Sequence, residues 1–403
     1  MKQDRQVHIQ KYFLQVKSAN IPSSVLFAER TKDKRKIPTE GLPGLILTAS
    51  LPAHNCNLQI AASKLTEQPV TWFYVKQGKS TALSTKETKT NTKVNPYKKQ
   101  FKQGATIVPR SFYFVELTQD VPDFDDRILH IKTADAIKPD AKMPWKEIDF
   151  NGKMESRFLF RTALSKSILP FALYKPDLVV LPVTVETNDG MKKIKLHDAI
   201  DIQRQGYLNA SKWFSNVENI WKIHRTEKNQ IISSENYLNW QNKLSEQNLN
   251  DPFVVLYNTS GKDANSVVIE RGKFDLEFLA DHKAYIFTTS VKNDAYYLSA
   301  ILNSSAPNKM MKDFQATGLF GARHVHKKIL DIFYPKFNEK NKVHNQLAKL
   351  SEQAHEKAKA YLIANVPKQE LSAIFLGRLR MEIKKHLKEE MEEIDELVKE
   401  VIG

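Results

Sequence analysis

The pattern of apolar and polar positions divides the chain into β-rich and helical stretches. Short apolar runs bounded by turn residues predict strands at 25–28, 42–50, 70–75, 178–183, 253–258, 266–269 and 284–289. Apolar residues at helical intervals predict helices at 59–65, 208–219, 234–244, 295–303 and 309–316. Because strands and helices do not alternate regularly, we expect an α+β fold.

Three segments are less regular. Pro109 lies inside the apolar segment 104–115 and favours an edge strand or a run split in two. Residues 119–151 are loop-like and acidic, and we expect a domain boundary there. Residues 156–167 fit either a helix or a strand. The aromatic side chains of the predicted helices are expected in the core and not on a base-stacking surface; they are Trp213, Trp221, Tyr237 and Trp240.

The C-terminal region predicts a helical hairpin. Apolar residues recur at helical spacing from Val343 until Pro367 interrupts the pattern. A second helix is predicted beyond the proline, with its apolar stripe at Ile383, Leu387, Met391, Ile394, Val398 and Val401. This stripe is expected to pack on the chain itself, and packing on a partner subunit is the alternative.

Positive charge is concentrated near the N-terminus. The chain has 61 Lys and Arg against 46 Asp and Glu, a formal net charge of +15. Residues 1–110 hold 19 of the basic and 6 of the acidic residues, which is a net charge of +13. Such a balance favours a polyanionic partner. The lysine-rich stretches 32–36 and 76–102 fit solvated loops and phosphate-contacting loops equally well.

Several classes of protein are excluded or disfavoured. The single cysteine, Cys56, cannot form an internal disulfide or build a structural zinc site, which favours a cytoplasmic protein. The first residues have no apolar stretch of signal-peptide length, and no window of the sequence is apolar enough to span a membrane. Dinucleotide-binding, P-loop, zinc-protease and serine-hydrolase motifs are absent from the sequence.

Two further patterns resemble catalytic motifs but do not support catalysis. Cys56 lies close to His54, but nothing in the sequence indicates an activated thiolate. Residues 95–97 (Asn-Pro-Tyr) and 251–253 (Asp-Pro-Phe) resemble the amine clamp of amino-methylating enzymes, yet both lack its second proline and fit turns better. The sequence therefore predicts no catalytic, cofactor-binding or metal-binding residue.

One segment combines glycines, an aromatic residue and basic side chains. It runs from 314 to 330 and contains Gly318, Phe320 and Gly321. Glycine lets a backbone approach a polyanion closely, and basic side chains contact phosphates or base edges. The basic members are Arg323, His324, His326, Lys327 and Lys328. The alternative is a glycine turn that caps an ordinary basic helix.

This segment, with residues 296–304 before it and 344–350 after it, resembles the C-terminal region of bacterial N6-adenine DNA methyltransferases of restriction-modification systems. Residues 104–110 (Gly-Ala-Thr-Ile-Val-Pro-Arg) are similar to the segment that opens the target-recognition region in that family. Residues 21–28 (Ile-Pro-Ser-Ser-Val-Leu-Phe-Ala) are similar to the last strands of its catalytic domain. The resemblance spans nearly the whole chain in the family's order.

The resemblance also implies what this chain lacks. In the family, the S-adenosylmethionine loop and the Asn-Pro-Pro-Tyr-type motif precede the strand that 21–28 resembles, and here that strand lies near Met1. We therefore expect a target-recognition portion that has no activity alone. Either a separate catalytic chain binds S-adenosylmethionine, or this chain is a truncated relic of a methyltransferase. The expected parts are a remnant strand region (1–30), a basic β-rich connecting region (31–150), an α+β DNA target-recognition domain (151–342) and the helical hairpin (343–403).

The expected partner is double-stranded DNA. The candidate contact residues are Arg110, Lys98, Lys99, Lys102, Phe320, Arg323, His324, His326, Lys327 and Lys328. Three alternatives stay open. A separate catalytic chain would restore an intact methyltransferase by docking. A specificity subunit of a multi-subunit restriction enzyme also pairs recognition domains with long helices, although no internal repeat is present. The third is a protein-interaction module whose basic loops only solubilise it.

Overall fold

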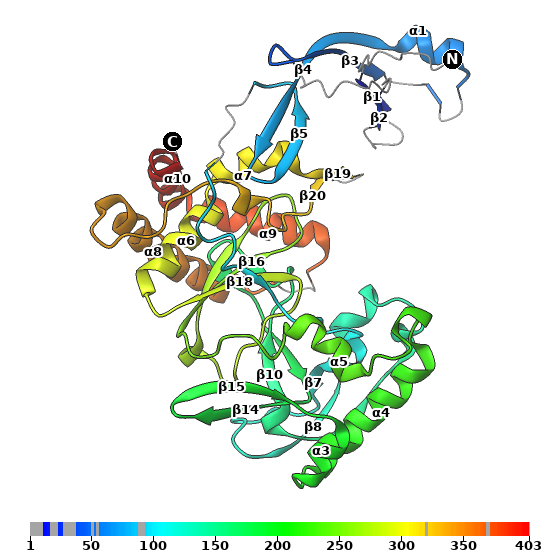
Figure 1. Cartoon of the computed structure of the whole chain (residues 1–403), viewed down its shortest axis with the longest axis vertical. Coiled ribbons are helices and arrows are strands. Elements are labelled where there is room, and N and C mark those ends of the chain that lie inside the picture. The colour runs from blue at the N-terminus through cyan, green and yellow to red at the C-terminus, as the bar shows by residue number, and fades with distance from the viewer. Residues whose placement is uncertain are drawn as a thin grey trace, which may run out of the picture.

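The computed structural model has an α+β fold, as the sequence predicts, with an N-terminal sheet at one end and helices α3 to α5 at the other (Figure 1). The residues it describes are 11–16, 23–26, 38–49, 52–53, 56–87, 93–318, 321–367 and 371–402. In the strands 11–16, 23–26, 316–318 and 321–323 the description covers the backbone alone. His54, Phe320 and the lysine-rich stretch 32–36 lie outside the described residues.

The N-terminal sheet has the strand order β2-β1-β3-β4-β5. Its elements are β1 (Lys11–Val16), β2 (Ser23–Leu26), β3 (Leu42–Ala49), α1 (Leu58–Lys64), β4 (Thr66–Gln77) and β5 (Ser80–Ser84). β1 runs parallel to β3, and the other pairs are antiparallel. The strand expected at 25–28 is thus found in part, as β2, and it pairs with β1.

A second sheet lies at the centre of the molecule, in the order β17-β16-β18-β6. Its strands are β6 (Lys102–Gln103), β16 (Phe253–Asn258), β17 (Ser266–Glu270) and β18 (Ala284–Thr289). Successive side chains of a strand point to opposite faces. Accordingly, Val255 and Tyr257 pack in a core with the C-terminal helices, whereas Val254 and Leu256 pack against Ile168 and its neighbours. Both faces are buried, which explains the unbroken apolar runs in the sequence.

The helices form one side of this core. They are α6 (Lys292–Asn303), α7 (Ser305–Met311), α8 (Lys342–Ala364), α9 (Ala373–His386) and α10 (Lys388–Ile402). The single helix expected after Pro367 is wrong, because the segment divides at Leu387 into α9 and α10. Ile383, Ile394 and Val398 are fully buried in the same core as α6 and α8. The apolar stripe therefore packs on the chain itself.

A third sheet belongs to the lower part of Figure 1, in the order β10-β13-β7-β8-β9, with all pairs antiparallel. Its strands are β7 (Phe114–Leu117), β8 (Ile128–Thr133), β9 (Asn151–Glu155), β10 (Leu159–Thr162) and β13 (Asp177–Val180). The reading of 119–151 as loop-like is wrong where β8 forms. Leu129 and Ile131 of β8 are buried, and pairing with two neighbouring strands fixes a conformation that the local sequence does not favour.

Helix α4 (Leu208–His224) packs on this sheet through Trp213, Phe214 and Val217. Trp213 and Trp221 are buried, as expected of core aromatics, but Trp240 is 47% exposed. Pro109 precedes the short helix α2 (Arg110–Tyr113), so the segment 104–115 is split and its second half continues into β7. The remaining elements are β11 (Ile168–Leu169), β12 (Ala172–Leu173), β14 (Val183–Asn188), β15 (Met191–Leu196), α3 (Ala199–Arg204), α5 (Ser234–Leu238), β19 (Ala316–Gly318) and β20 (Gly321–Arg323).

Among the described residues, no helix is long and apolar enough to cross a membrane.

Candidate nucleic-acid interface

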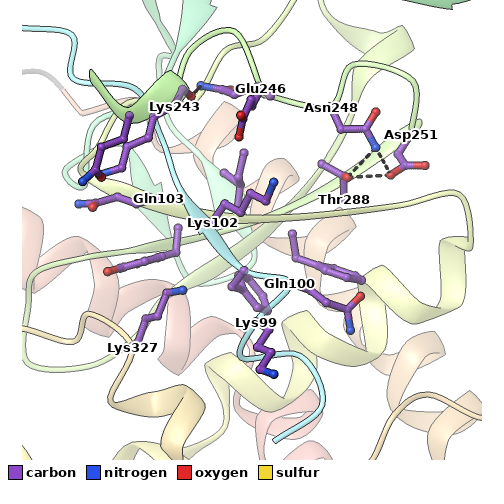
Figure 2. Close-up of a pocket in the computed structure, with 16 residues that line it drawn as sticks. Lys99, Gln100, Lys102, Gln103, Lys243, Glu246, Asn248, Asp251, Thr288 and Lys327 are labelled. Carbon is purple, nitrogen blue, oxygen red and sulfur yellow. Dashed lines mark hydrogen bonds between the residues drawn. The ribbon is translucent and has the colours of Figure 1, made fainter. Parts of the chain in front are cut away.

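A cleft of about 640 Å³ lies beside the central sheet, and we call it the basic cleft (Figure 2). One wall is formed by residues 99–103, which include β6, and by residues 285–288 of the neighbouring strand β18. The opposite wall is formed by residues 241–251, between α5 and β16. Lys327 closes one end. The cleft therefore joins segments that are far apart in the sequence.

Four lysines line the basic cleft against two carboxylates. The lysines are Lys99, Lys102, Lys243 and Lys327, and the carboxylates are Glu246 and Asp251. Asp251 accepts hydrogen bonds from Thr288 Oγ1 at 2.7 Å and from Asn248 Nδ2 at 2.6 Å. These donors are neutral, so Asp251 keeps its charge, but four ammonium groups against two carboxylates leave the cleft with a net positive charge.

Lys99 and Lys102 are exposed, so both ammonium groups can reach an approaching phosphate. Lys327 is held more firmly. Its Nζ lies 5.6 Å from the ring centroid of Tyr285 and donates a 3.5 Å hydrogen bond to the Lys98 carbonyl. Burial lowers the pKa of Lys327. The cleft thus combines two exposed lysines, Lys99 and Lys102, with Lys327, which is held by the Tyr285 ring and the Lys98 carbonyl.

Lys98 has a different environment from Lys99. Its ammonium forms an ion pair with the buried carboxylate of Asp331. Burial, followed by the nearby charges of Lys79 and Lys327, lowers the pKa of Lys98. The Asp331 pair holds this lysine inward, so it supports the basic cleft and is not one of its lining residues.

His324 and His326 form a stacked pair next to Lys327. Their ring centroids are 5.4 Å apart with planes inclined by 18°, and both side chains are exposed. The His326 N–H donates to the Thr259 carbonyl at 3.0 Å, and Tyr257 Oη donates to the His326 carbonyl at 2.8 Å. These bonds fix the segment to the end of β16 despite positive φ angles of 66° and 40° at the two histidines.

His326 lies near three other basic side chains, His324, Lys328 and Lys283. Burial, followed by the charges of His324, Lys328 and Lys283, lowers the pKa of His326. Its imidazole is therefore neutral at pH 7 and able to donate and accept hydrogen bonds. Lys328 donates through Nζ to the Phe314 carbonyl. Lys283 also lines a second cavity, together with Arg110.

The structure thus brings together five of the ten predicted contact residues. Lys99, Lys102 and Lys327 share the basic cleft, and the two histidines lie next to it. Arg110 lies in the second cavity. Of Arg323, only the backbone, in β20, is described. Phe320 is outside the described residues.

Sequence reasoning missed Lys243 and Lys283. Each is a single lysine in a segment without a basic run, so no local charge pattern marked it. The only available signal for Lys283 was its position directly before a predicted strand. Lys243 lines the basic cleft and Lys283 lines the second cavity, in each case because chain segments separated by more than a hundred residues fold against each other.

No protein-family model and no curated protein matches the chain. Several solved structures are similar to it, including the two that follow. The type IIL restriction-modification enzyme MmeI, solved in complex with DNA, aligns over 94% of this chain and 40% of its own, with 10% identity and a TM-score of 0.48. The type IIG restriction endonuclease BpuSI aligns over 99% of this chain and 44% of its own, with 11% identity and a TM-score of 0.32.

This chain spans less than half the length of either enzyme. Both of these neighbours are restriction-modification enzymes, but likenesses of this degree assign neither a family nor a function to the chain.

Proposed function

We propose that the chain binds duplex DNA along the basic cleft and reads the target of adenine-N6 methylation in a restriction-modification system. In this proposal the chain is a recognition portion without its own S-adenosylmethionine site. Methyl transfer would be carried out by a separate catalytic chain. The segments that resemble N6-adenine methyltransferases supply the reaction class, and the basic cleft supplies the binding surface.

The convergence of four lysines carries the proposal. Lys99 and Lys102, Lys243, and Lys327 come from three separate parts of the sequence, yet all line one cleft. Solvated loops would have no reason to gather like charges, because such charges repel one another. A polyanion relieves that repulsion and releases its own counterions when lysines replace them. On the opposite wall, the exposed side-chain amide of Gln241 can donate and accept hydrogen bonds of the kind that read base edges.

The number of lysines in the basic cleft sets the expected salt dependence of DNA binding. Each neutralised phosphate contributes about 0.9 to the slope of log affinity against log salt. Four contacts give a slope of about −3.6, which is a loss of roughly a hundredfold between about 50 and 200 mM salt.

The experiment is duplex-DNA binding by the purified chain at those two salt concentrations, with and without S-adenosylmethionine. Steep salt dependence that ignores the cofactor is the expected result. Binding that strengthens with S-adenosylmethionine would contradict the absence of a methyl-donor site in this chain. A shallow salt dependence would favour a protein-interaction module, and no binding at the lower concentration would overturn the DNA-reading function.

A further inference from the structure

The second cavity, which Lys283 and Arg110 help to line, has a volume of about 540 Å³, and we call it the aromatic pocket. It is lined by the start of α2, by residues 137–145, by the end of α4 with the residues that follow it, and by His282 and Lys283. Its volume is within the roughly 300–1,000 Å³ that is usual for small-molecule sites. The basic cleft and this pocket have no lining residue in common.

The lining of the aromatic pocket is strongly cationic. Its charged side chains are Arg110, Lys142, Arg225 and Lys283, against the single carboxylate of Asp140 among the described lining residues. His224 and His282 add two further nitrogen-bearing rings. Walls of low dielectric focus the field of such a cluster, so an anionic group is attracted into the cavity.

One wall is aromatic. The rings of Trp145 and Trp221 are stacked with centroids 6.1 Å apart, and Tyr237 packs on Trp221 at 4.8 Å. Trp221 is buried, whereas Trp145 is only half-buried and lines the cavity. An aromatic surface of this kind stacks on any nucleobase, because every base presents a π face.

Two buried polar atoms at the pocket lack partners. Arg110 Nε and Ser111 Oγ have no hydrogen-bond partner among the described residues, and Ser111 as a whole is only 2% exposed. Both residues line the pocket. Buried polar groups are nearly always hydrogen-bonded in native proteins. The unpaired N–H of Arg110 and the unpaired hydroxyl of Ser111 are therefore donors that a ligand with acceptor oxygens could engage, in residues that line a cationic cavity.

We infer that the aromatic pocket binds a nucleotide. Its phosphate would lie against Arg110, Ser111 and Lys283, and its base would stack on the wall that Trp145 presents. The phosphate would accept hydrogen bonds from the unpaired donors and pair with the positive charges. The base would stack on the aromatic wall. The same chemistry is offered by a free nucleotide and by an unstacked nucleotide of a DNA strand. The inference does not depend on DNA binding in the basic cleft.

The test is isothermal titration of the full chain with deoxyadenosine 5′-monophosphate, and in parallel with deoxyadenosine and with inorganic phosphate. We expect the nucleotide to bind at one site and more tightly than either fragment. Lys283→Gln should weaken binding about tenfold, the usual effect of losing one charge-assisted hydrogen bond. Lys142→Gln, at an exposed lining position, provides a second variant that does not affect the core. Lys193→Gln, an exposed lysine outside both cavities, is the matched control and should bind normally.

Competition with a short single-stranded oligodeoxyadenylate distinguishes the two sources. Displacement of the nucleotide by the oligonucleotide identifies a DNA strand as an occupant, and failure to displace identifies a free nucleotide. Equal affinity for phosphate and nucleotide, or no change in both lining variants, would overturn the inference. If the nucleotide does not bind while duplex DNA still does, only this inference fails. If the nucleotide binds while duplex DNA does not, only the proposed function is overturned.

Discussion

The ammonium of Lys98 pairs with the carboxylate of Asp331 across 233 positions of the sequence. The same carboxylate accepts a 2.6 Å hydrogen bond from Ser80 Oγ, in the first residue of β5. Gln77 Nε2 donates to the Asp331 carbonyl at 3.3 Å. A single buried residue therefore ties the β4–β5 hairpin both to the chain that leads into the basic cleft and to the segment that follows Lys327.

Removal of this carboxylate should loosen the hairpin. Asp331→Ala leaves the Ser80 hydroxyl and the Lys98 ammonium unpaired, at a cost of about 1–3 kcal/mol. Lys79 lies in the exposed turn of the hairpin, so the readout is the rate of tryptic cleavage after Lys79, which should rise roughly tenfold. Asp135→Ala removes an exposed carboxylate with two lysine partners and should leave that rate unchanged. Equal cleavage rates in the two variants would show that Asp331 does not hold the hairpin.

Gly78 forms the turn between β4 and β5 with a φ of +54°, and a Cβ there would lie 2.8 Å from Asp331 Oδ1. Gly78→Ala should therefore combine left-handed strain of about 1 kcal/mol with a clash. In the Asp331→Ala background the 2.8 Å contact disappears, although the contacts with the backbone oxygen at 3.2 Å and with Cβ at 3.3 Å of residue 331 stay. The melting-temperature loss caused by Gly78→Ala should therefore shrink.

Gly190→Ala is the control for that prediction. Gly190 has a φ of +75° with no atom within 4 Å of the added Cβ, so its effect should be the same in both backgrounds. Full additivity of Gly78→Ala with Asp331→Ala would contradict the close contact.

The exposed lysines of the basic cleft should determine how strongly salt weakens DNA binding. The double variant Lys99→Gln/Lys102→Gln is expected to reduce the slope of log affinity against log salt by about 2, with weaker binding to all sequences. Fluorescence anisotropy with a labelled duplex measures it. The double variant Lys193→Gln/Lys212→Gln removes the same charge from exposed positions outside the cleft. If both double variants change the slope equally, net charge and not the cleft governs binding.

His355 should make folding stability depend on pH. Its Nε2 accepts from the Val268 N–H at 2.9 Å, and Nδ1 lies 2.7 Å from the Ser351 carbonyl. Burial lowers the pKa of His355 from 6.5 to about 4. The unfolded chain therefore binds the proton first as pH falls, and about 3 kcal/mol of stability is lost between pH 6.5 and about 4.

Urea unfolding of the wild type and of His355→Gln at several pH values tests this prediction. Glutamine keeps one donor and one acceptor but does not titrate in this range. The variant should be less stable than the wild type at pH 7, and the difference should narrow as the pH falls toward 4. A constant difference across this range would mean that His355 is not the titrating group.

The sequence by itself determined much of the secondary structure. The runs at 253–258 and 284–289 became β16 and β18 with the same bounds, because their apolar side chains fill cores on both faces of the sheet. The C-terminal apolar stripe indicated a helical region that packs on the chain, and the basic bias of the first 110 residues pointed to Lys99 and Lys102. These are local properties, recorded in neighbouring residues.

Tertiary structure decided the rest. β8 forms within a segment that reads as a loop, because two adjacent strands pair with it. The C-terminal helix divides at Leu387, whose buried side chain packs in the core at the break. Lys243 joins Lys99 in the basic cleft, and Lys283 joins Arg110 in the aromatic pocket, only through the way distant segments fold against each other. Periodicity records which face of an element is buried, whereas the position of a charge in a site depends on contacts between segments that no local pattern encodes.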